Sequence, residues 1–140
     1  MRFSMRLPMR LPMRWIALAV SAIALLPLPA AAQDCPIKDF SHEAREELLR
    51  NAPTCDKSME LFGACSYGAS GDISLGQIVT EKCEAGFLSK LGKSQRQAYD
   101  RQMKACDRQY AKEDGTMYRA MAAGCRARLA QTYARRAAKR

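Results

Sequence analysis

The residues best suited to chemistry in this 140-residue chain are its six cysteines. No two of them are closer in sequence than Cys55 and Cys65, whereas a zinc site usually contains ligand pairs roughly two to four residues apart. The chain also has a single histidine. An even number of widely spaced cysteines is typical of a disulfide framework in an exported protein, so we expect disulfides and no metal site. The cysteines are Cys35, Cys55, Cys65, Cys83, Cys106 and Cys125.

The remaining candidates for catalysis are His42 and the carboxylates of Asp100 and Asp107. An active site needs a nucleophile with a base, a tuned carboxylate pair or a metal. His42 falls in the first turn of an acidic predicted helix, which indicates a surface residue. Asp100 and Asp107 stand among basic residues of their own predicted helix, which favours ion pairs. No glycine-rich phosphate motif appears. We therefore expect a protein that is not an enzyme and binds no cofactor.

Residues 1–32 have the three parts of a secretory signal peptide. Four arginines and no acidic residue form its basic beginning, and residues 15–26 are all apolar except Ser21. This run is shorter than the roughly 20 apolar residues that a membrane-spanning helix needs. Alanines at 30–32 supply the small residues of a cleavage site, so we place cleavage before Gln33. The sequence thus predicts a periplasmic or secreted protein without a transmembrane segment after processing, in which residues 33–140 form one domain.

Removal of the signal changes the charge of the chain. The whole chain carries +9 at neutral pH, but residues 33–140 keep 19 basic and 14 acidic residues, a net charge of +5. Residues 126–140, the basic tail, contain six basic residues and no acidic one. These cations either complement the negative end of a helix dipole or attract the protein to an anionic envelope surface. Nucleic acid would fit the charge but not the compartment, so we expect no nucleic-acid partner.

The mature chain has the apolar periodicity of helices, and strand-like alternation is absent. Proline, glycine and capping residues divide it into about five helices. Ser41, Asp72 and Thr116 are the expected N-caps of the first, third and fifth helices. The second helix should start at Thr54, and the fourth at Ser94, where Gln97 completes a capping-box pattern. The third helix should end at Gly92, and the fifth should present Tyr118, Met121, Ala122, Cys125 and Leu129 on one buried face before it frays in the tail. Short connections predict an all-α, disulfide-stapled bundle with two antiparallel helical hairpins.

The disulfide pairing follows less directly from the sequence. The turn at Gly115 lies midway between Cys106 and Cys125, which favours a bridge between the fourth and fifth helices. We expect Cys55 to pair with Cys65 and Cys35 with Cys83, although a bridge from Cys83 to Cys106 would also flank a turn.

Residues 66–71 form the best candidate for a recognition element. This segment is rich in glycine and serine and follows Cys65, so a disulfide would anchor its base. Tyr67 offers a rigid aromatic contact of the kind that dominates interfaces. We take Tyr67, Ser70 and Asp72 as candidate partner-binding residues; the alternative is a segment that only connects two helices.

Two segments of the mature chain resemble the LprI-type lysozyme-inhibitor family, which comprises small exported helical proteins of bacterial envelopes. One is residues 55–65, followed by Asp72 and Leu75, and the other runs from Cys106 through the glycine turn at 115–117 to Cys125. The chain departs from the family at Gly76, where the family usually has asparagine. The resemblance implies a bacterial envelope protein that inhibits lysozyme by binding, with a loop plugging the acidic catalytic cleft. The alternative is a structural envelope protein held to anionic surfaces by its basic tail.

Overall fold

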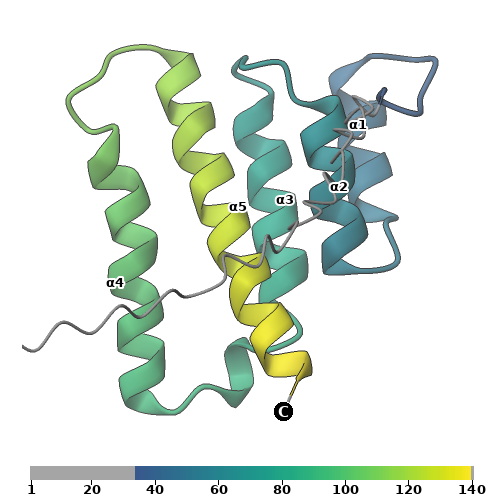
Figure 1. The fold of residues 1–140 in the computed structure, drawn as a ribbon. Coiled ribbons are helices and arrows are strands. Elements are labelled where there is room, and N and C mark those ends of the chain that lie inside the picture. The colour runs from purple at the N-terminus through teal and green to yellow at the C-terminus, as the bar shows by residue number, and fades with distance from the viewer. Residues whose placement is uncertain (1–33, 140) are drawn as a thin grey trace, which may run out of the picture. The chain divides into compact units, whose positions relative to one another are not determined.

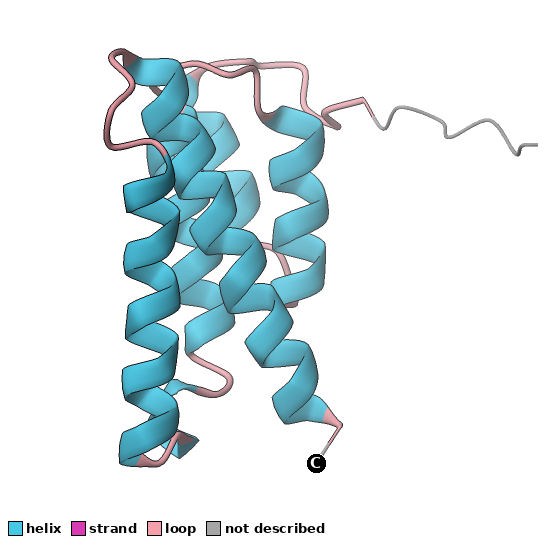
Figure 2. Ribbon diagram, turned by 60° about the vertical axis from the view of Figure 1, so that its left-hand side comes forward, coloured by secondary structure: helices cyan, strands magenta, loops and turns pink. Residues whose placement is uncertain are grey.

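The computed structural model describes residues 34–139, so the predicted signal peptide lies outside the described residues. Within them the chain is all-helical and contains no strand (Figures 1 and 2), which confirms the predicted fold class. None of the described helices combines the length and apolar character that crossing a membrane requires. The elements are α1 (His42–Arg50), α2 (Cys55–Cys65), α3 (Asp72–Glu84), the short 3-10 helix η1 (Leu88–Lys90), α4 (Lys93–Gln109) and α5 (Thr116–Ala138).

The first two helices begin where their capping residues predict. The Ser41 hydroxyl accepts a hydrogen bond from the backbone N–H of Ala44 at 3.2 Å, and the Thr54 hydroxyl accepts one from Lys57 at 3.1 Å. Each bond satisfies one of the N–H groups that the first turn of a helix leaves without a partner. The N-cap at Ser41 and the start of the second helix at Thr54 are confirmed.

The other three helices begin before their predicted starting residues. Helix α3 has Gly71 as its N-cap, because the carboxylate of Asp72 is occupied by the preceding loop. Helix α4 is capped at Gly92, whose N–H donates to the Gln95 side chain, so Ser94 lies inside the helix. Helix α5 is capped at Gly115, whose φ of 112° is strained for any residue with a side chain.

Helix α3 ends at Glu84, several residues before the predicted end at Gly92. The chain then turns through η1, and this turn places Phe87 in a cluster with two tyrosines. The Phe87 ring lies 5.3 Å from that of Tyr99 in α4 and 5.6 Å from that of Tyr133 in α5. The Tyr99 hydroxyl donates to Glu84 at 2.7 Å, and burial together with this carboxylate raises the pKa of Tyr99. Burial of Phe87 therefore outweighs continuation of the helix.

Helix α3 is the centre of the bundle and packs against α1, α2 and α5 (Figure 1). Lys82 of α3 also donates to the backbone carbonyls of Arg50 and Ala52, both at 2.8 Å, and so satisfies the C-terminal end of α1. Helix α4 packs principally on α5 at the edge of the bundle. The central apolar cluster comes from α1, α2, α3 and α5 and includes Leu49, Leu61, Phe62, Leu75, Ile78, Val79, Ala127 and Ala130.

The buried face of α5 differs from the predicted one. Met121 is 44 % exposed, and Tyr118, Cys125 and Leu129 are only half-buried. Of the predicted face only Ala122 is buried. The buried residues of α5 are all small, namely Ala120, Ala122, Ala123, Gly124, Ala127 and Ala130. The pattern of large apolar residues failed here because alanine contributes little to hydrophobic periodicity, yet it allows the closest approach between helices.

Gly76 of α3 lies in close contact with Ala123 of α5. A Cβ atom added at Gly76 would lie 2.9 Å from the Ala123 Cβ and 3.0 Å from its backbone carbonyl carbon. Because one of these contacts is backbone, a side-chain rotation cannot relieve the clash. The glycine at this position is therefore required by the packing of α3 on α5.

All six cysteines are paired, but only one predicted bridge is present. Cys106–Cys125 joins α4 to α5 and confirms the prediction. The predicted 55–65 and 35–83 bridges, and the alternative 83–106 bridge, are wrong: Cys35 pairs with Cys65 and Cys55 with Cys83. Cys55 and Cys65 are the first and last residues of α2, which separates their Cα atoms by about 15 Å along the helix axis. A disulfide spans at most roughly 7 Å.

Substitution of Gly76 by alanine tests the α3–α5 contact. We expect Gly76→Ala to lower the free energy of unfolding by about 1–2 kcal/mol, because overpacking outweighs the gain in helix propensity. Gly63→Ala is the matched control, since Gly63 lies within α2 with no atom near an added Cβ; it should raise stability by about 0.5–1 kcal/mol. Urea unfolding without reductant measures both. Equal effects of the two substitutions would contradict the packing argument.

Candidate recognition loop

The segment between α2 and α3, residues 66–71, lies at one end of the bundle (Figure 1) and carries an exposed aromatic side chain. Tyr67 is 60 % exposed, and Ser70 is exposed as well. Gly68 has a φ of 75°, in the left-handed region that glycine occupies without strain. We refer to residues 66–71 as the recognition loop.

The carboxylate of Asp72 fixes the path of the recognition loop from inside. Its Oδ2 atom accepts hydrogen bonds from the backbone N–H groups of Tyr67 at 2.8 Å, Gly68 at 2.6 Å and Ala69 at 3.1 Å. Asp72 is only 2 % exposed. Hydrogen bonds to an ionised acceptor are stronger than neutral ones. Asp72, predicted as a partner-binding residue, is thus buried and positions the loop, whereas Tyr67 and Ser70 are available at the surface.

Arg45 of α1 contacts the base of the recognition loop, Asp72 and Tyr67. Its Nη1 atom donates to the Cys65 carbonyl at 3.2 Å and lies 3.7 Å from Oδ1 of Asp72. Its guanidinium group also lies over the Tyr67 ring, 5.5 Å from the ring centroid, which is within the range of a cation–π interaction. Sequence reasoning missed Arg45, because its partners are 20 or more residues away and only the fold brings them together.

The base of the recognition loop is covalently anchored. Cys65 at the end of α2 is bridged to Cys35, so the segment before α1 is tied to the start of the loop. The next residue, Ser66, donates from its hydroxyl to the Phe62 carbonyl at 2.6 Å. The prediction that a disulfide anchors the loop at Cys65 is therefore confirmed, although the partner is Cys35 rather than Cys55.

The end of the loop is fastened to α1 through His42. Nε2 of His42 lies 3.0 Å from the Ser74 hydroxyl and 3.1 Å from Glu46, while Ser74 donates to the Gly71 carbonyl at 3.0 Å. The Ser74 hydroxyl is the main cause of a lowered pKa at Glu46, and Arg50 and His42 lower it further. In a catalytic triad the two partners of the histidine contact different ring nitrogens. Here Ser74 and Glu46 both contact Nε2 of His42. The group therefore joins α1 to α3 and has no separate residue that orients the imidazole.

The two remaining carboxylates considered for catalysis lie apart from this loop. Asp100 pairs with Arg96 within α4 at 3.2 Å, and Asp107 pairs with Arg126 of α5. Both aspartates are thus ion-paired at the surface as expected, but neither pairs with the basic residue next to it in sequence. Among the described residues, no three histidine, cysteine or acidic side chains are grouped so that they could hold a metal.

We compared the chain with known protein families, curated proteins and solved structures. No protein-family model, curated protein or solved structure matches the chain. The three disulfides themselves indicate that the folded chain belongs in an oxidising environment.

Loss of the Asp72 carboxylate should release the recognition loop. In Asp72→Ala, we expect amide hydrogen exchange at residues 67–69 to accelerate by roughly ten- to a hundredfold, because hydrogen bonds to a charged acceptor contribute about 1.5–3 kcal/mol. Asp114→Ala, in the exposed turn before α5, is the control and should leave these amides unchanged. Core amides of α3 serve as the internal reference for global unfolding. Unchanged exchange at residues 67–69 in Asp72→Ala would disprove the positioning role.

Proposed function

We propose that this chain is an exported envelope protein that acts by binding, and that the recognition loop is its contact surface. The observation that carries the proposal is the exposed Tyr67 on a loop held by the buried Asp72, by Arg45 and by the Cys35–Cys65 bridge. A loop that is ordered before binding loses less conformational entropy when it meets a partner. Tyrosine is also among the residues that most often dominate binding energy.

The partner we propose is a lysozyme-type muramidase, which the loop would inhibit by entering its acidic catalytic cleft. This choice rests on the family resemblance described above. The charge distribution supports the encounter rather than the insertion: residues 42–84, which include α1–α3, contain four basic and eight acidic residues, whereas loop residues 66–71, which would enter the acidic cleft, carry no charge. A cationic muramidase would therefore meet the acidic part of the bundle, although the mature chain as a whole is basic.

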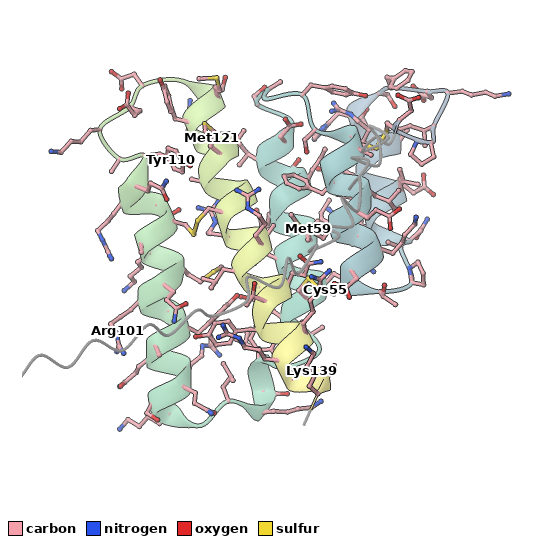
Figure 3. The ribbon with its side chains drawn as sticks, viewed as in Figure 1. Cys55, Met59, Arg101, Tyr110, Met121 and Lys139 are labelled. Carbon is pink, nitrogen blue, oxygen red and sulfur yellow. A yellow bond between two sulfur atoms is a disulfide. The ribbon has the colours of Figure 1, made fainter. Side chains whose placement is uncertain are left out.

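Inhibition assays with the mature protein test this function. We expect wild-type protein to slow hydrolysis of peptidoglycan by lysozyme, and Tyr67→Ala to weaken inhibition by about thirtyfold, the effect of losing a central contact worth about 2 kcal/mol. Met121→Ala is the matched control, because Met121 is also a large exposed side chain but lies on α5 (Figure 3). Absence of inhibition of several lysozyme classes, or equal losses in both variants, would refute the proposal.

A second candidate function is attachment to anionic envelope membranes through the basic tail. Helix α5 continues through the tail to Ala138, so the prediction that it frays in the tail is wrong. Arg126 pairs with Asp107, and Arg135 pairs with Asp56 at 2.7 Å and is the main cause of a lowered pKa at Asp56. The remaining described cations of the tail form no ion pair with a described residue and could face a membrane; they are Arg128, Arg136 and Lys139.

Removal of residues 126–140 would not test this candidate cleanly, because it also removes the core residues Ala127 and Ala130. A triple variant, Arg128→Gln, Arg136→Gln and Lys139→Gln, keeps the helix. We expect it to bind phosphatidylglycerol vesicles roughly a hundredfold more weakly than wild type, since each cation near an anionic surface contributes about 1 kcal/mol. Sedimentation with vesicles at low salt measures the binding. Unchanged sedimentation would exclude the tail as an attachment site.

A further inference from the structure

The two parts of the bundle carry charges of opposite sign. Whereas residues 42–84 are acidic, residues 85–139, which include α4 and α5, contain 13 basic and four acidic residues. The basic excess is therefore not confined to the tail. Five of these cations belong to α4, which packs principally on α5 and has no other described helix packed on its opposite face.

Four cations of α4 share this outward face. Lys93, Arg101, Lys104 and Arg108 are all exposed. At about 100° of rotation per residue they fall within roughly 80° of one another on the helix surface. The inward side is occupied instead by the buried Tyr99 and Cys106. Figure 3 shows Arg101 on the side of α4 away from α5. We call these four residues the α4 ridge.

The acidic residues of α4 do not neutralise the ridge. Asp100 and Asp107 flank it, but they pair with Arg96 and with Arg126 of α5. The four ridge cations form no ion pair with a described residue. Neighbouring cations three or four residues apart on a helix repel one another. The ridge is thus a row of uncompensated positive charge that an anionic ligand would stabilise.

We propose that the α4 ridge binds an extended polyanion, a polymer that carries a phosphate or carboxylate on each repeat. The ridge is about 22 Å long at the rise of an α-helix, and it is a single line of charge along one helix. Its outward face has no large apolar side chain that would enter a bilayer. Arg101 and Arg108 each present a planar fork that matches phosphate and carboxylate oxygens. This binding is independent of the recognition loop and of the basic tail.

The affinity of such a site depends on salt in a predictable way. Each cation that contacts the polymer releases condensed counterions, so the logarithm of the binding constant falls linearly with the logarithm of salt concentration. For a single-stranded polyanion each contact contributes about 0.7 to the slope. The slope therefore measures how many cations contact the polymer, a number that the net charge of the protein does not give.

Fluorescence titrations with long-chain inorganic polyphosphate and with a polyuronate such as alginate test the inference. We compare wild-type mature protein with a ridge triple variant, Arg101→Gln, Lys104→Gln and Arg108→Gln. The ridge variant should bind at least about tenfold more weakly at low salt, and its salt slope should fall by about 2. Binding to one or both polymers with this loss supports the ridge, and the polymer that binds identifies the anionic group.

A control triple variant, Lys38→Gln, Lys112→Gln and Arg119→Gln, removes the same number of charges from exposed cations outside both the ridge and the basic tail. It should retain most of the affinity for the polymer. Equal losses in both triple variants would show that the effect depends only on net charge and would overturn the proposal. Failure of the wild-type protein to bind both polymers would overturn it as well. Preferential binding of wild type to phosphatidylglycerol vesicles, lost in the ridge variant, would assign the ridge to membranes instead. Circular dichroism checks that both variants remain helical.

Discussion

The contact between α3 and α5 is the interaction on which the rest of this structure depends. The Cys35–Cys65 and Cys55–Cys83 bridges lie within the part of the chain up to α3, and Cys106–Cys125 lies within the α4–α5 hairpin. All six cysteines are used in this way, so no disulfide links the two parts. Apart from the connecting chain they are joined by non-covalent contacts, among them the fit of Ala123 against Gly76, which leaves no room for a Cβ atom. Each disulfide can contribute about 2–4 kcal/mol to its own part, but the orientation of the parts depends on this packing.

The same division separates the two surfaces that we propose for binding. The recognition loop belongs to the acidic part, and the α4 ridge belongs to the basic part. Polar contacts also cross the division where the parts meet. Arg135 forms an ion pair with Asp56, and the Tyr99 hydroxyl donates a hydrogen bond to Glu84. Exposed charges farther apart than about 10 Å are largely screened at moderate salt. The acidic part can therefore attract a cationic partner while the α4 ridge attracts an anionic one.

Sequence patterns predicted the fold to the extent that it is set by local interactions. The hydroxyl caps at Ser41 and Thr54 and the bridge across the Gly115 turn depend on residues close in sequence. The pairings of Cys35 and Cys55 depend on how α2 and α3 pack, which no local pattern encodes. The length of α2 nevertheless excluded a 55–65 bridge, because the predicted helix already placed these cysteines about 15 Å apart. The alanine face of α5 could not be found from hydrophobicity, because its importance lies in small size.

The candidate site was predictable in the same partial way. A run rich in glycine and serine after Cys65 indicated a loop, and Tyr67 is exposed on it as expected. The role of Asp72 was misjudged because an aspartate at the start of a helix usually caps that helix. Here its carboxylate turns back to three N–H groups of the preceding loop, and Arg45 approaches its second oxygen from α1. Oδ1 accepts no hydrogen bond from a described residue and has only the Arg45 charge beside it, so this buried carboxylate depends on a cation that only the folded bundle brings to it. The order of the recognition loop is therefore a property of the packed tertiary structure rather than of the loop sequence.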